Sequence, residues 1–410
     1  MNKKTVDHVD VAGQRVLVRL DLNVPLEGGR ITDDRRITAA LPTVRKLIEG
    51  GGRLILMSHL GRPTGDPQKD RAFTLKPVAD RLGELLGRPV AFAPASIGPE
   101  VEALVKGLGD GDVCLLENLR FNDAETIKDQ KARDDAALRR AKDEFARALA
   151  SLADVYVNDA FGTCHRDNAS MLTVPQMMEG KPRVTGYLVK KELEFLGNAI
   201  AEPGRPFVVV LGGAKVSDKI GVIENLIDKC DTILVGGAMC YTFFAAEGRA
   251  VGRSLVEQDR LEEARRLRAA AGDRLRLPVD SVAAGEIKQG IGTRVCQETI
   301  PDDLMGLDVG PETVGAYQEV IAGARTIVWN GPMGVFETPP FDTGTLAVAQ
   351  AMAAATAAGA VTIVGGGDSA AAVEAAGLAE RMSHVSTGGG ASLELLEGKK
   401  FAAIEILDEP

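Results

Sequence analysis

The sequence lacks an excess of positive charge. It has 48 Lys and Arg residues against 58 Asp and Glu residues, which gives a formal net charge of −10. A general nucleic-acid binder, or a protein held on an anionic membrane, usually carries a basic face, so we expect neither kind of partner. Any anion that this protein binds must therefore be held by a local cluster of basic side chains.

Cysteine is also scarce. The chain has five cysteines, an odd number, and no two of them form a C-x-x-C pair. This pattern predicts reduced thiols in a cytoplasmic protein. Cys164 stands beside His165, as a nucleophile and its base would. Sequence neighbours rarely have the required geometry, however, so we do not favour a thiol nucleophile.

Long apolar runs are few. The first residues, "MNKKTVDHVDVAG", contain no apolar core of the kind found in signal peptides. One stretch, from Thr343 to Gly367, carries no charged residue and is rich in alanine. We interpret it as a small-residue helix packed on a sheet, followed by the strand "AVTIV". A membrane span is the less favoured alternative.

Short apolar runs alternate with helical patterns along all 410 residues, a length that allows two domains. Runs that are short, continuous and bounded by Gly or Pro are typical of parallel strands buried on both faces. The pattern predicts a doubly wound α/β fold with two parallel sheets. The predicted strands lie in "RVLVRLDLN", "RLILMSHLGR", "DVCLLENLRF", "DVYVNDAFG", "FVVVLGGAK", "TILVGGAM", "TIVWNGPMG", "VTIVGGGD" and "HVSTGGG".

The domain organisation is predicted from glycines and prolines that bracket a helical stretch at about residues 187–200. We expect an N-terminal domain over residues 1–180, a hinge with an inter-domain helix over 181–200, and a C-terminal domain over 201–395. The tail, residues 396–410, is expected to return toward the N-terminal domain. Residues 122–150 are densely charged, and we interpret them as a solvated helix face without a catalytic role.

Ligands of open α/β sheets lie beyond the carboxyl ends of the strands, and the two halves differ there. The first half ends its strands in charged and hydrogen-bonding side chains, which are Asp21, Asn23, His59, Arg62, Arg120, His165 and Arg166. Each arginine alone could be an ordinary surface residue, but their recurrence indicates an anionic substrate. Arg36 lies in a predicted first helical turn capped by Asp33 or Asp34, where it either awaits an anion or pairs with those aspartates.

The second half ends its strands in glycine-rich turns: "GGAK", "GGAM", "NGPMG", "GGGDS" and "GGGAS". Glycine lets backbone amides approach a phosphate closely, and the following helix directs its positive end there. Lys215 and Lys219 add positive charge to the first of these turns. Asp368 offers an oxygen ligand for Mg²⁺, and Glu337 could accept hydrogen bonds from a ribose. The half therefore indicates a phosphorylated ligand.

Two nucleotide signatures can be compared with the sequence. No G-x-x-x-x-G-K-[ST] is present, so this is not a Walker-A protein. "VGGGDSAAAVEAAG" contains G-x-G-x-x-A after a predicted strand, as in dinucleotide-binding enzymes. The next strand ends at Ser386, where such a site needs an acid, which weakens but does not remove the dehydrogenase alternative.

Several motifs in their order resemble the phosphoglycerate kinase family over essentially the whole chain. They are "RLDLNVPLEGGRITDDRRITAALPT", "SHLGRP", "LENLRF", "VNDAFGTCHR", "LGGAKVSDKI", "VWNGPMGVFE", "GGGDS" and "STGGGASLE". The resemblance implies two Rossmann-like three-layer αβα domains with parallel sheets joined by an inter-domain helix. It implies reversible, Mg²⁺-dependent phosphoryl transfer between 1,3-bisphosphoglycerate and ADP by a monomer, with 3-phosphoglycerate bound by the N-terminal domain and ATP or ADP by the C-terminal domain.

The resemblance also implies residue roles. On the acid side these are Asp21 and Asn23 at the glycerate, Arg62, Arg120 and Arg166 at its 3-phosphate with His59 and His165 nearby, and Arg36 at the carboxyl end. Lys215 and Arg36 would contact the migrating phosphoryl group. On the nucleotide side they are Lys219 at the phosphates, Gly366, Gly367, Asn330 and Ser369 close by, Asp368 on Mg²⁺, Glu337 at the ribose, and Pro332 and Val335 at the adenine.

The chain departs from the family's pattern at a few places. Asn168 stands where a second histidine is frequent, Ser369 replaces threonine, the charged segment after Phe121 is longer, and the tail reads "FAAIEILDEP". A phosphate-binding scaffold that has lost catalysis is an alternative, which the intact Arg36, Lys215, Lys219 and Asp368 disfavour. We expect direct in-line transfer, with closure of the two domains about the hinge.

Overall fold

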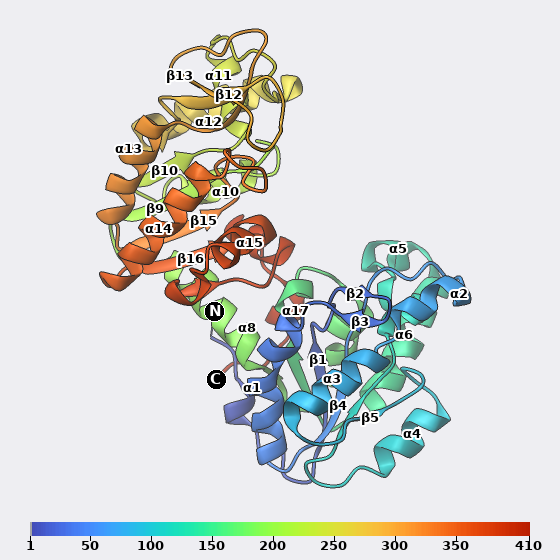
Figure 1. Cartoon of the computed structure of the whole chain (residues 1–410). Coiled ribbons are helices and arrows are strands. Elements are labelled where there is room, and N and C mark those ends of the chain that lie inside the picture. Colours follow the sequence, from blue (N-terminus) through green and yellow to red (C-terminus); the bar gives the residue numbers. More distant parts are fainter. Residues whose placement is uncertain (1) are drawn as a thin grey trace. The chain divides into compact units, whose positions relative to one another are not determined.

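The computed structural model, which describes residues 2–410, divides the chain into two compact units (Figure 1). The first comprises the residues up to Glu194 together with Lys400–Pro410, and the second comprises Phe195–Lys399. Each unit is built around a six-stranded parallel sheet with helices packed against it, as the sequence predicts. Within the described residues, no helix is both long enough and apolar enough to cross a membrane.

The sheet of the first unit has the strand order β5-β6-β4-β1-β7-β8. Its strands are β1 (Arg15–Leu20), β4 (Arg53–Met57), β5 (Ala91–Phe92), β6 (Val113–Leu115), β7 (Val155–Asp159) and β8 (Arg183–Thr185). Its longer helices are α1 (Arg35–Glu49), α3 (Lys76–Leu86), α4 (Pro99–Lys106) and α6 (Ala136–Ser151). Shorter elements are the hairpin of β2 (Leu26–Glu27) and β3 (Arg30–Ile31), and the helices α2 (Pro67–Asp70), α5 (Asp129–Asp134), α7 (Val174–Met177), α8 (Tyr187–Glu192) and α17 (Ala402–Glu405).

This sheet is buried on both faces because β1 sends alternate side chains to two apolar cores. Val16 and Val18 pack in one core with Ile37 of α1. Leu17 packs in the other core with Phe145 of α6. Side chains along a strand alternate between faces, so a strand covered on both sides must be apolar at nearly every position. The continuous apolar runs of the sequence follow from this arrangement.

The sheet of the second unit has the strand order β11-β10-β9-β15-β16-β17. These strands are β9 (Phe207–Leu211), β10 (Thr232–Val235), β11 (Leu275–Arg276), β15 (Thr326–Asn330), β16 (Val361–Gly365) and β17 (His384–Val385). A separate antiparallel sheet joins β13 (Arg294–Cys296), β12 (Ser281–Ala284) and β14 (Met305–Val309). The helices are α9 (Ala199–Ala201), α10 (Ile220–Leu226), α11 (Met239–Ala246), α12 (Leu261–Ala271), α13 (Pro311–Ala322), α14 (Thr343–Ala357), α15 (Gly367–Ala375) and α16 (Gly390–Leu396).

All nine predicted apolar runs form parallel strands, and the alanine-rich stretch forms α14 followed by β16. The antiparallel sheet and the short strands β5, β8 and β11 were not predicted. The helical stretch expected near residues 187–200 consists of α8, a π-helical turn (Leu193–Asn198) and α9. The last part of the tail, Lys400–Pro410, belongs to the first unit, where the amide of Lys4 donates to the carbonyl of Asp408 and the amide of Asp408 donates to the carbonyl of Arg183, both at 2.8 Å. The exact domain limits given above remain predictions.

The charged segment over residues 122–150 corrects one expectation. It was expected to be a solvated helix face, but Glu125 and Lys142 are fully buried. Lys142 Nζ donates to Asp129 Oδ1 at 2.7 Å and to the carbonyl oxygen of Asp167 at 2.6 Å. A buried charge needs a partner, and these partners lie too far along the chain for a helical pattern to reveal them.

Candidate active site

The predicted acid-binding residues of the first unit follow four neighbouring strands. In the order β6-β4-β1-β7 all pairings are parallel, so the loops after these strands emerge at one edge of the sheet. The residues in these loops are Asp21 and Asn23 after β1, His59 and Arg62 after β4, Arg120 after β6, and His165 and Arg166 after β7. The strand order therefore gathers side chains that are far apart in the sequence.

Backbone and side-chain hydrogen bonds tie these loops together. Asn23 Oδ1 accepts a hydrogen bond from the amide of Gly61 at 2.8 Å. Arg120 Nη1 donates to the carbonyl of the same glycine at 2.6 Å. Asp21 Oδ1 accepts from the amide of Asn23 at 3.3 Å. These hydrogen bonds hold the loops after β1, β4 and β6 against one another. They therefore fix the backbone positions from which the predicted acid-binding side chains extend.

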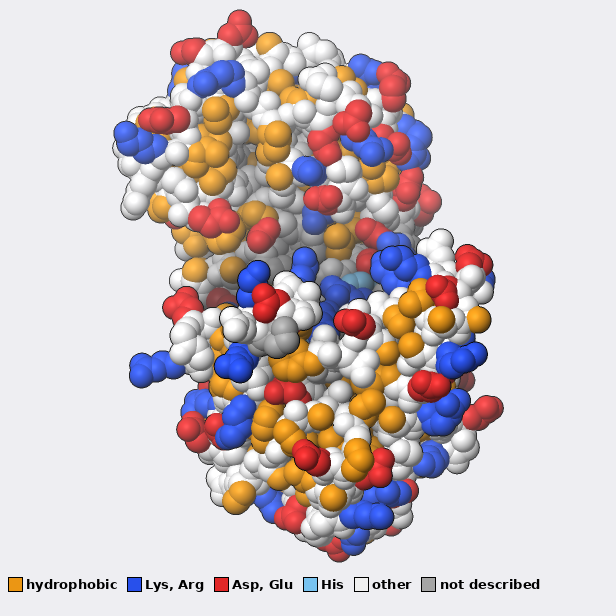
Figure 2. Space-filling model, turned by 90° about the vertical axis from the view of Figure 1, so that its right-hand side faces the viewer, with side chains coloured by type: hydrophobic (Ala, Val, Ile, Leu, Met, Phe, Trp, Pro, Cys, Tyr) orange, Lys and Arg blue, Asp and Glu red, His pale blue; other side chains and the backbone are white. Residues whose placement is uncertain are grey.

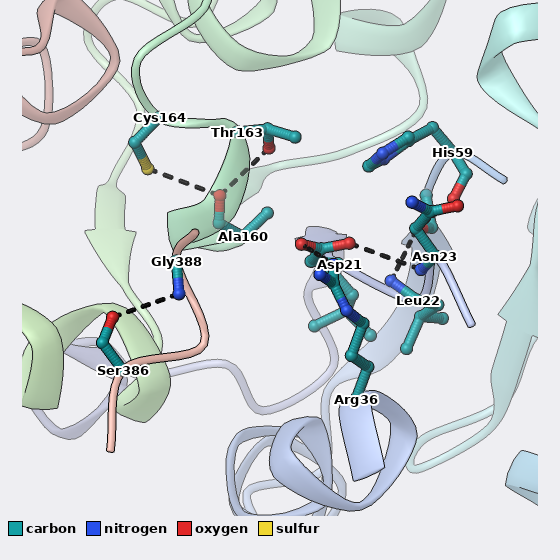
Figure 3. Close-up of polar contacts among 12 residues, drawn as sticks. Asp21, Leu22, Asn23, Arg36, His59, Ala160, Thr163, Cys164, Ser386 and Gly388 are labelled. Atoms are coloured by element: carbon teal, nitrogen blue, oxygen red, sulfur yellow. Dashed lines mark hydrogen bonds and ion pairs between the residues drawn. The ribbon is translucent and has the colours of Figure 1, made fainter. Parts of the chain in front are cut away.

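Arg36 lies in the first turn of α1 and pairs with Asp21 (Figure 3). The alternative pairing with the aspartates of its own helix start is wrong. Asp33 is engaged by Arg35. Asp34 occupies the N-cap position, but its carboxylate accepts from Arg81 Nη2 at 2.7 Å instead of capping α1. Arg36 is therefore directed toward the loop after β1.

Arg120 shows that positive charge is concentrated at this edge. Burial, together with the charges of Arg166, Arg19 and Arg62, lowers its pKa to about 10 against the opposing effect of Glu125. Within residues 2–410, the buried Nε of Arg120 has no hydrogen-bond partner. Figure 2 shows Lys and Arg side chains gathered beside a histidine. Several guanidinium groups with few acids beside them form a site suited to an anion.

His59 is buried within the same cluster. Burial and the charges of Arg19, Arg120, Arg166 and Arg36 hold its pKa well below the usual value for histidine. The ring is therefore neutral at physiological pH, and the positive charge around it is carried by the guanidinium groups.

His165 and Arg166 contact each other in the loop after β7. Arg166 Nε donates to His165 Nε2 at 3.2 Å, and the imidazole ring of His165 lies 6.4 Å from the ring of Phe401 in the tail. Cys164 does not pair with His165. Its thiol donates to the carbonyl of Ala160 at 3.5 Å, and burial raises its pKa (Figure 3). A buried thiol that is held neutral is not a nucleophile.

The five glycine-rich turns of the second unit also lie at one sheet edge. They follow β10, β9, β15, β16 and β17, which are consecutive neighbours in the sheet. The turns after β9, β10 and β15 pack on one another. A Cβ added to Gly212 would lie 2.0 Å from the carbonyl oxygen of Pro332, and one on Gly331 would lie 2.2 Å from the carbonyl oxygen of Gly212.

Several amides of these packed turns donate to carbonyl groups of the protein. The amide of Gly213 donates to the carbonyl of Pro332 at 2.9 Å, and that of Gly237 donates to the carbonyl of Met333 at 2.8 Å. Close packing of the three turns accounts for Gly212, Gly237 and Gly331, where an added Cβ would meet backbone atoms, and a phosphate contact at these turns stays a prediction. By contrast, a Cβ on Gly367, Gly389 or Gly390 would meet nothing within 4 Å.

Lys219 lies at the N-cap position of α10 and is 9% exposed. Its Nζ donates to Asn330 Oδ1. Burial lowers the pKa of Lys219, while Asp218, Asp368 and Glu397 act in the opposite direction. The Nδ2 of Asn330 is buried and has no partner among the described residues. Lys219 and Asn330 thus form a buried donor pair at this edge.

The remaining nucleotide-side residues surround the open turn after β16. Gly366 has a φ of 89° and precedes α15, whose first turn contains Gly367, exposed Asp368 and buried Ser369. Ser369 Oγ accepts from the amide of Gly331 at 2.6 Å, which joins the turns after β15 and β16. The N-terminus of α15 thus presents amides that no side chain caps.

Lys215, Glu337, Pro332 and Val335 occupy the other loops of this edge. Lys215 and Glu337 are exposed. Pro332 is buried in the packed turns, and half-buried Val335 packs on a small apolar cluster formed by Ala284, Leu307 and Phe341. Pro332 and Val335 therefore belong to the walls of this edge, and Lys215 and Glu337 project from it.

Metal binding at this edge depends on single carboxylates. Among the described residues, no group of three or more His, Cys, Asp or Glu side chains could hold a metal ion. Asp368 is a single exposed carboxylate at the start of α15. Mg²⁺ commonly binds through one or two carboxylates together with substrate phosphates and water, and a lone carboxylate fits that kind of site.

Arg19 is the main residue of the first edge that the sequence reasoning missed. It is 1% exposed within β1 and contributes positive charge to both His59 and Arg120. The available signal was an arginine flanked on both sides by apolar residues in "VLVRL". A charge within a doubly buried strand requires a buried partner or a function.

Comparison with known proteins decides the family. The sequence model of the family described as phosphoglycerate kinase matches residues 6–399. The chain belongs to the phosphoglycerate kinase family. It is 55% identical to the phosphoglycerate kinase of Rhodopirellula baltica and 53% identical to that of Chloroherpeton thalassium, over 100% and 99% of both chains respectively.

Solved structures of phosphoglycerate kinases have the same fold. The structure from Coxiella burnetii superimposes with a TM-score of 0.84 at 39% identity, and that from Pyrococcus horikoshii with 0.82 at 31%, each covering 98% of both chains. The chain is therefore a phosphotransferase with a carboxyl group as acceptor. It catalyses the glycolytic phosphoryl transfer between 1,3-bisphosphoglycerate and ADP, giving 3-phosphoglycerate and ATP. The dehydrogenase alternative is wrong.

Proposed function

We propose that the two units divide the substrates of this reaction between them. The arginine-rich edge of the first unit binds 3-phosphoglycerate or 1,3-bisphosphoglycerate, and the edge of the second unit with its open turn at α15 binds ATP or ADP. The observation that carries the proposal is the concentration of Arg36, Arg120 and Arg166 around neutral His59, with Arg62 acting on Arg120. Such a cluster in an acidic protein needs an anion to balance it.

On the acid side, each group has a distinct task. Arg62, Arg120 and Arg166 hold the 3-phosphate through guanidinium hydrogen bonds, with His59 and His165 adjacent. The carboxylate of Asp21 accepts a hydrogen bond from the glycerate hydroxyl. The side-chain amide of Asn23 donates to the glycerate carboxyl group. Arg36, held by Asp21, meets the carboxyl end where the phosphoryl group is exchanged.

On the nucleotide side, the open amides of α15 and the ammonium group of Lys219 meet the phosphates, because a helix N-terminus and a buried cation both favour anions. Gly366 and Gly367 allow close approach, and Asn330 and Ser369 fix the shape of the turn. Pro332 and Val335 face the adenine, and Glu337 accepts from the ribose. Asp368 would hold Mg²⁺, which supplies charge neutralisation between the phosphate oxygens when bound.

Replacing Asp368 with asparagine tests the magnesium role. We expect the Mg²⁺ concentration for half-maximal rate to rise roughly tenfold or more, because the carboxylate charge that attracts the ion is lost. The measurement is a coupled assay of ADP formation from ATP and 3-phosphoglycerate at varied Mg²⁺. Glu380→Gln removes an exposed charge from the same unit and should leave the Mg²⁺ dependence unchanged. An unshifted Mg²⁺ dependence in Asp368→Asn would remove Asp368 from the metal site.

The transfer itself is direct and in line. Lys215 and Arg36 stabilise the equatorial oxygens of the migrating phosphoryl group, where charge spreads in the transition state. No residue of this chain is phosphorylated on the way. We further propose that the protein acts as a monomer in the cytoplasm.

Substrates held by different units react only after the units approach each other, so we propose closure about the hinge. Small-angle scattering should show a smaller radius of gyration with 3-phosphoglycerate and a non-reacting ATP analogue together than with neither compound. The same radius in both states would count against closure, and each compound alone serves as the control.

A further inference from the structure

A buried chain of polar groups lies behind His59. It consists of Glu125, Ser170 and Arg19, and leads to the imidazole ring of His59. Glu125 and Ser170 have no exposed surface, Arg19 is 1% exposed and His59 is 5% exposed. Burying a carboxylate and a guanidinium costs free energy unless their hydrogen-bonding groups have partners. The hydrogen bonds of these four residues therefore indicate the role of the buried polar groups.

The contacts run without a break from the acid to the imidazole. Glu125 accepts from the backbone amide of Ser170 at 2.9 Å and from its hydroxyl at 2.7 Å. Arg19 Nε donates to Ser170 Oγ at 2.9 Å, and Arg19 Nη2 lies 3.2 Å from His59 Nδ1. The hydroxyl of Ser170 thus accepts from the guanidinium and donates to the carboxylate, bridging the two charges.

The chemistry of arginine sets the direction of the last bond. A guanidinium group has only donors, so His59 Nδ1 must accept from Arg19 with its lone pair. The proton of a neutral imidazole is then at Nε2. A second proton on Nδ1 would place an N–H group against the N–H of Arg19, within a cluster that already contains Arg36, Arg120 and Arg166. The neighbouring cations thus oppose protonation.

We propose that Glu125, Ser170 and Arg19 are positioning residues that hold His59 as the neutral Nε2–H tautomer, so that it donates to an anionic oxygen of the bound acid. The substrate contact rests on the proposed acid site, whereas the tautomer is a property of the ligand-free protein. Glu125 lies in the charged segment after Phe121, so this segment would contribute to the acid site. Asn168 joins the same chain, since its Nδ2 donates to Glu125 Oε1 at 3.3 Å.

The tautomer can be read directly by NMR. The chain has four histidines, so the full-length protein with ¹⁵N-labelled histidine gives four ring systems, and His59→Gln assigns the one of interest. Two-bond ¹H–¹⁵N correlations in the ligand-free protein should show His59 protonated at Nε2 and unprotonated at Nδ1 between about pH 8 and about pH 5.5. A proton on Nδ1, or titration near the ordinary histidine pKa, would overturn the proposal.

Removing the bridge tests the positioning role. Ser170→Ala deletes the hydroxyl between Arg19 and Glu125, and Glu125→Gln removes the buried charge; if the second variant does not fold, the first still decides. We expect loss of the single tautomer and a roughly tenfold higher KM for 3-phosphoglycerate, with the KM for ATP unchanged, as for removal of one charge-assisted hydrogen bond. The matched control is Glu144→Gln, an exposed acid on α6, with no change in either readout. An unchanged tautomer and KM in Ser170→Ala would refute the role of the chain.

Adding 3-phosphoglycerate separates the inference from the proposed acid site. A shift of the His59 Nε2 signal on saturation supports the donor role. If the His59 signal does not shift although the ring has the expected tautomer, the contact with substrate is refuted. Glu125, Ser170 and Arg19 would then still fix the tautomer of His59.

Discussion

Replacing Lys215 with alanine is expected to lower kcat roughly a hundredfold or more, because a donor aimed at developing charge contributes about 3–4 kcal/mol to transition-state stabilisation. Lys215 is exposed in the turn after β9, and we propose that its side chain meets the migrating phosphoryl group. The KM for ATP should change much less than kcat, because the interaction forms mainly in the transition state. Steady-state kinetics in both directions provide the measurement.

Lys288→Ala is the matched control for Lys215→Ala. Lys288 is an exposed lysine of the same unit, paired at 3.8 Å with Glu286, and its loss should leave both kinetic constants unchanged. A Lys215→Ala variant with normal kcat and only a raised KM for nucleotide would show that Lys215 binds substrate and transition state equally. The proposed contact with the migrating group would then be wrong.

Replacing Asp159 with asparagine is expected to change how stability depends on pH. Asp159 ends β7 and is 1% exposed, and its Oδ1 accepts from the amides of Leu188 at 2.9 Å and Val189 at 3.2 Å at the start of α8. Burial raises its pKa to about 6, against the opposing hydrogen bonds from Thr43 and these amides. An asparagine keeps the accepting oxygen and cannot ionise.

The sign follows from the raised pKa. Because the folded protein binds this proton more tightly than the unfolded chain, the stability that the protonated acid contributes is complete below about pH 3.8 and is lost as the pH rises through about 6. A shift of about two pKa units corresponds to roughly 3 kcal/mol. Relative to the wild type, Asp159→Asn should therefore gain roughly 3 kcal/mol of unfolding free energy between about pH 4 and about pH 8.

Urea unfolding across this range measures the difference. Asp308 provides a contrast, because it is 2% exposed and burial raises its pKa to about 7, but both its oxygens accept backbone amides, from Val309 at 2.9 Å and Gly344 at 2.8 Å. Asp308→Asn places an N–H group against one of these amides and should destabilise the protein. If Asp159→Asn instead loses stability at about pH 8, the start of α8 stabilises the charged carboxylate, and the pKa of Asp159 is not raised.

The sheets and their functional edges could be predicted from the sequence for a simple physical reason. Parallel strands covered on both faces must be apolar throughout, so β1, β4 and β9 stand out as continuous runs. The polar residues that follow each run then share one sheet edge. By contrast, the antiparallel strands β12 and β13 are short and mix polar with apolar residues, which gives no comparable pattern.

The details that escaped prediction depend on contacts between distant segments. Glu125 and Lys142 lie in a pattern typical of a solvated helix, and their burial is explained by partners elsewhere in the chain, such as Ser170 for Glu125 and the carbonyl of Asp167 for Lys142. Gly212 and Gly367 look alike in the sequence. The first is required by the carbonyl of Pro332 and the second faces open space, a distinction that composition alone cannot reveal.

The division of substrates between the two units is tested most directly by a crystal structure of the protein with 3-phosphoglycerate and Mg-ADP. The account predicts the acid against Arg62, Arg120 and Arg166 in the first unit, and the nucleotide phosphates against Lys219 and the amides of Gly367 in the second. Both compounds in one unit, or these arginines directed away from any ligand, would contradict it.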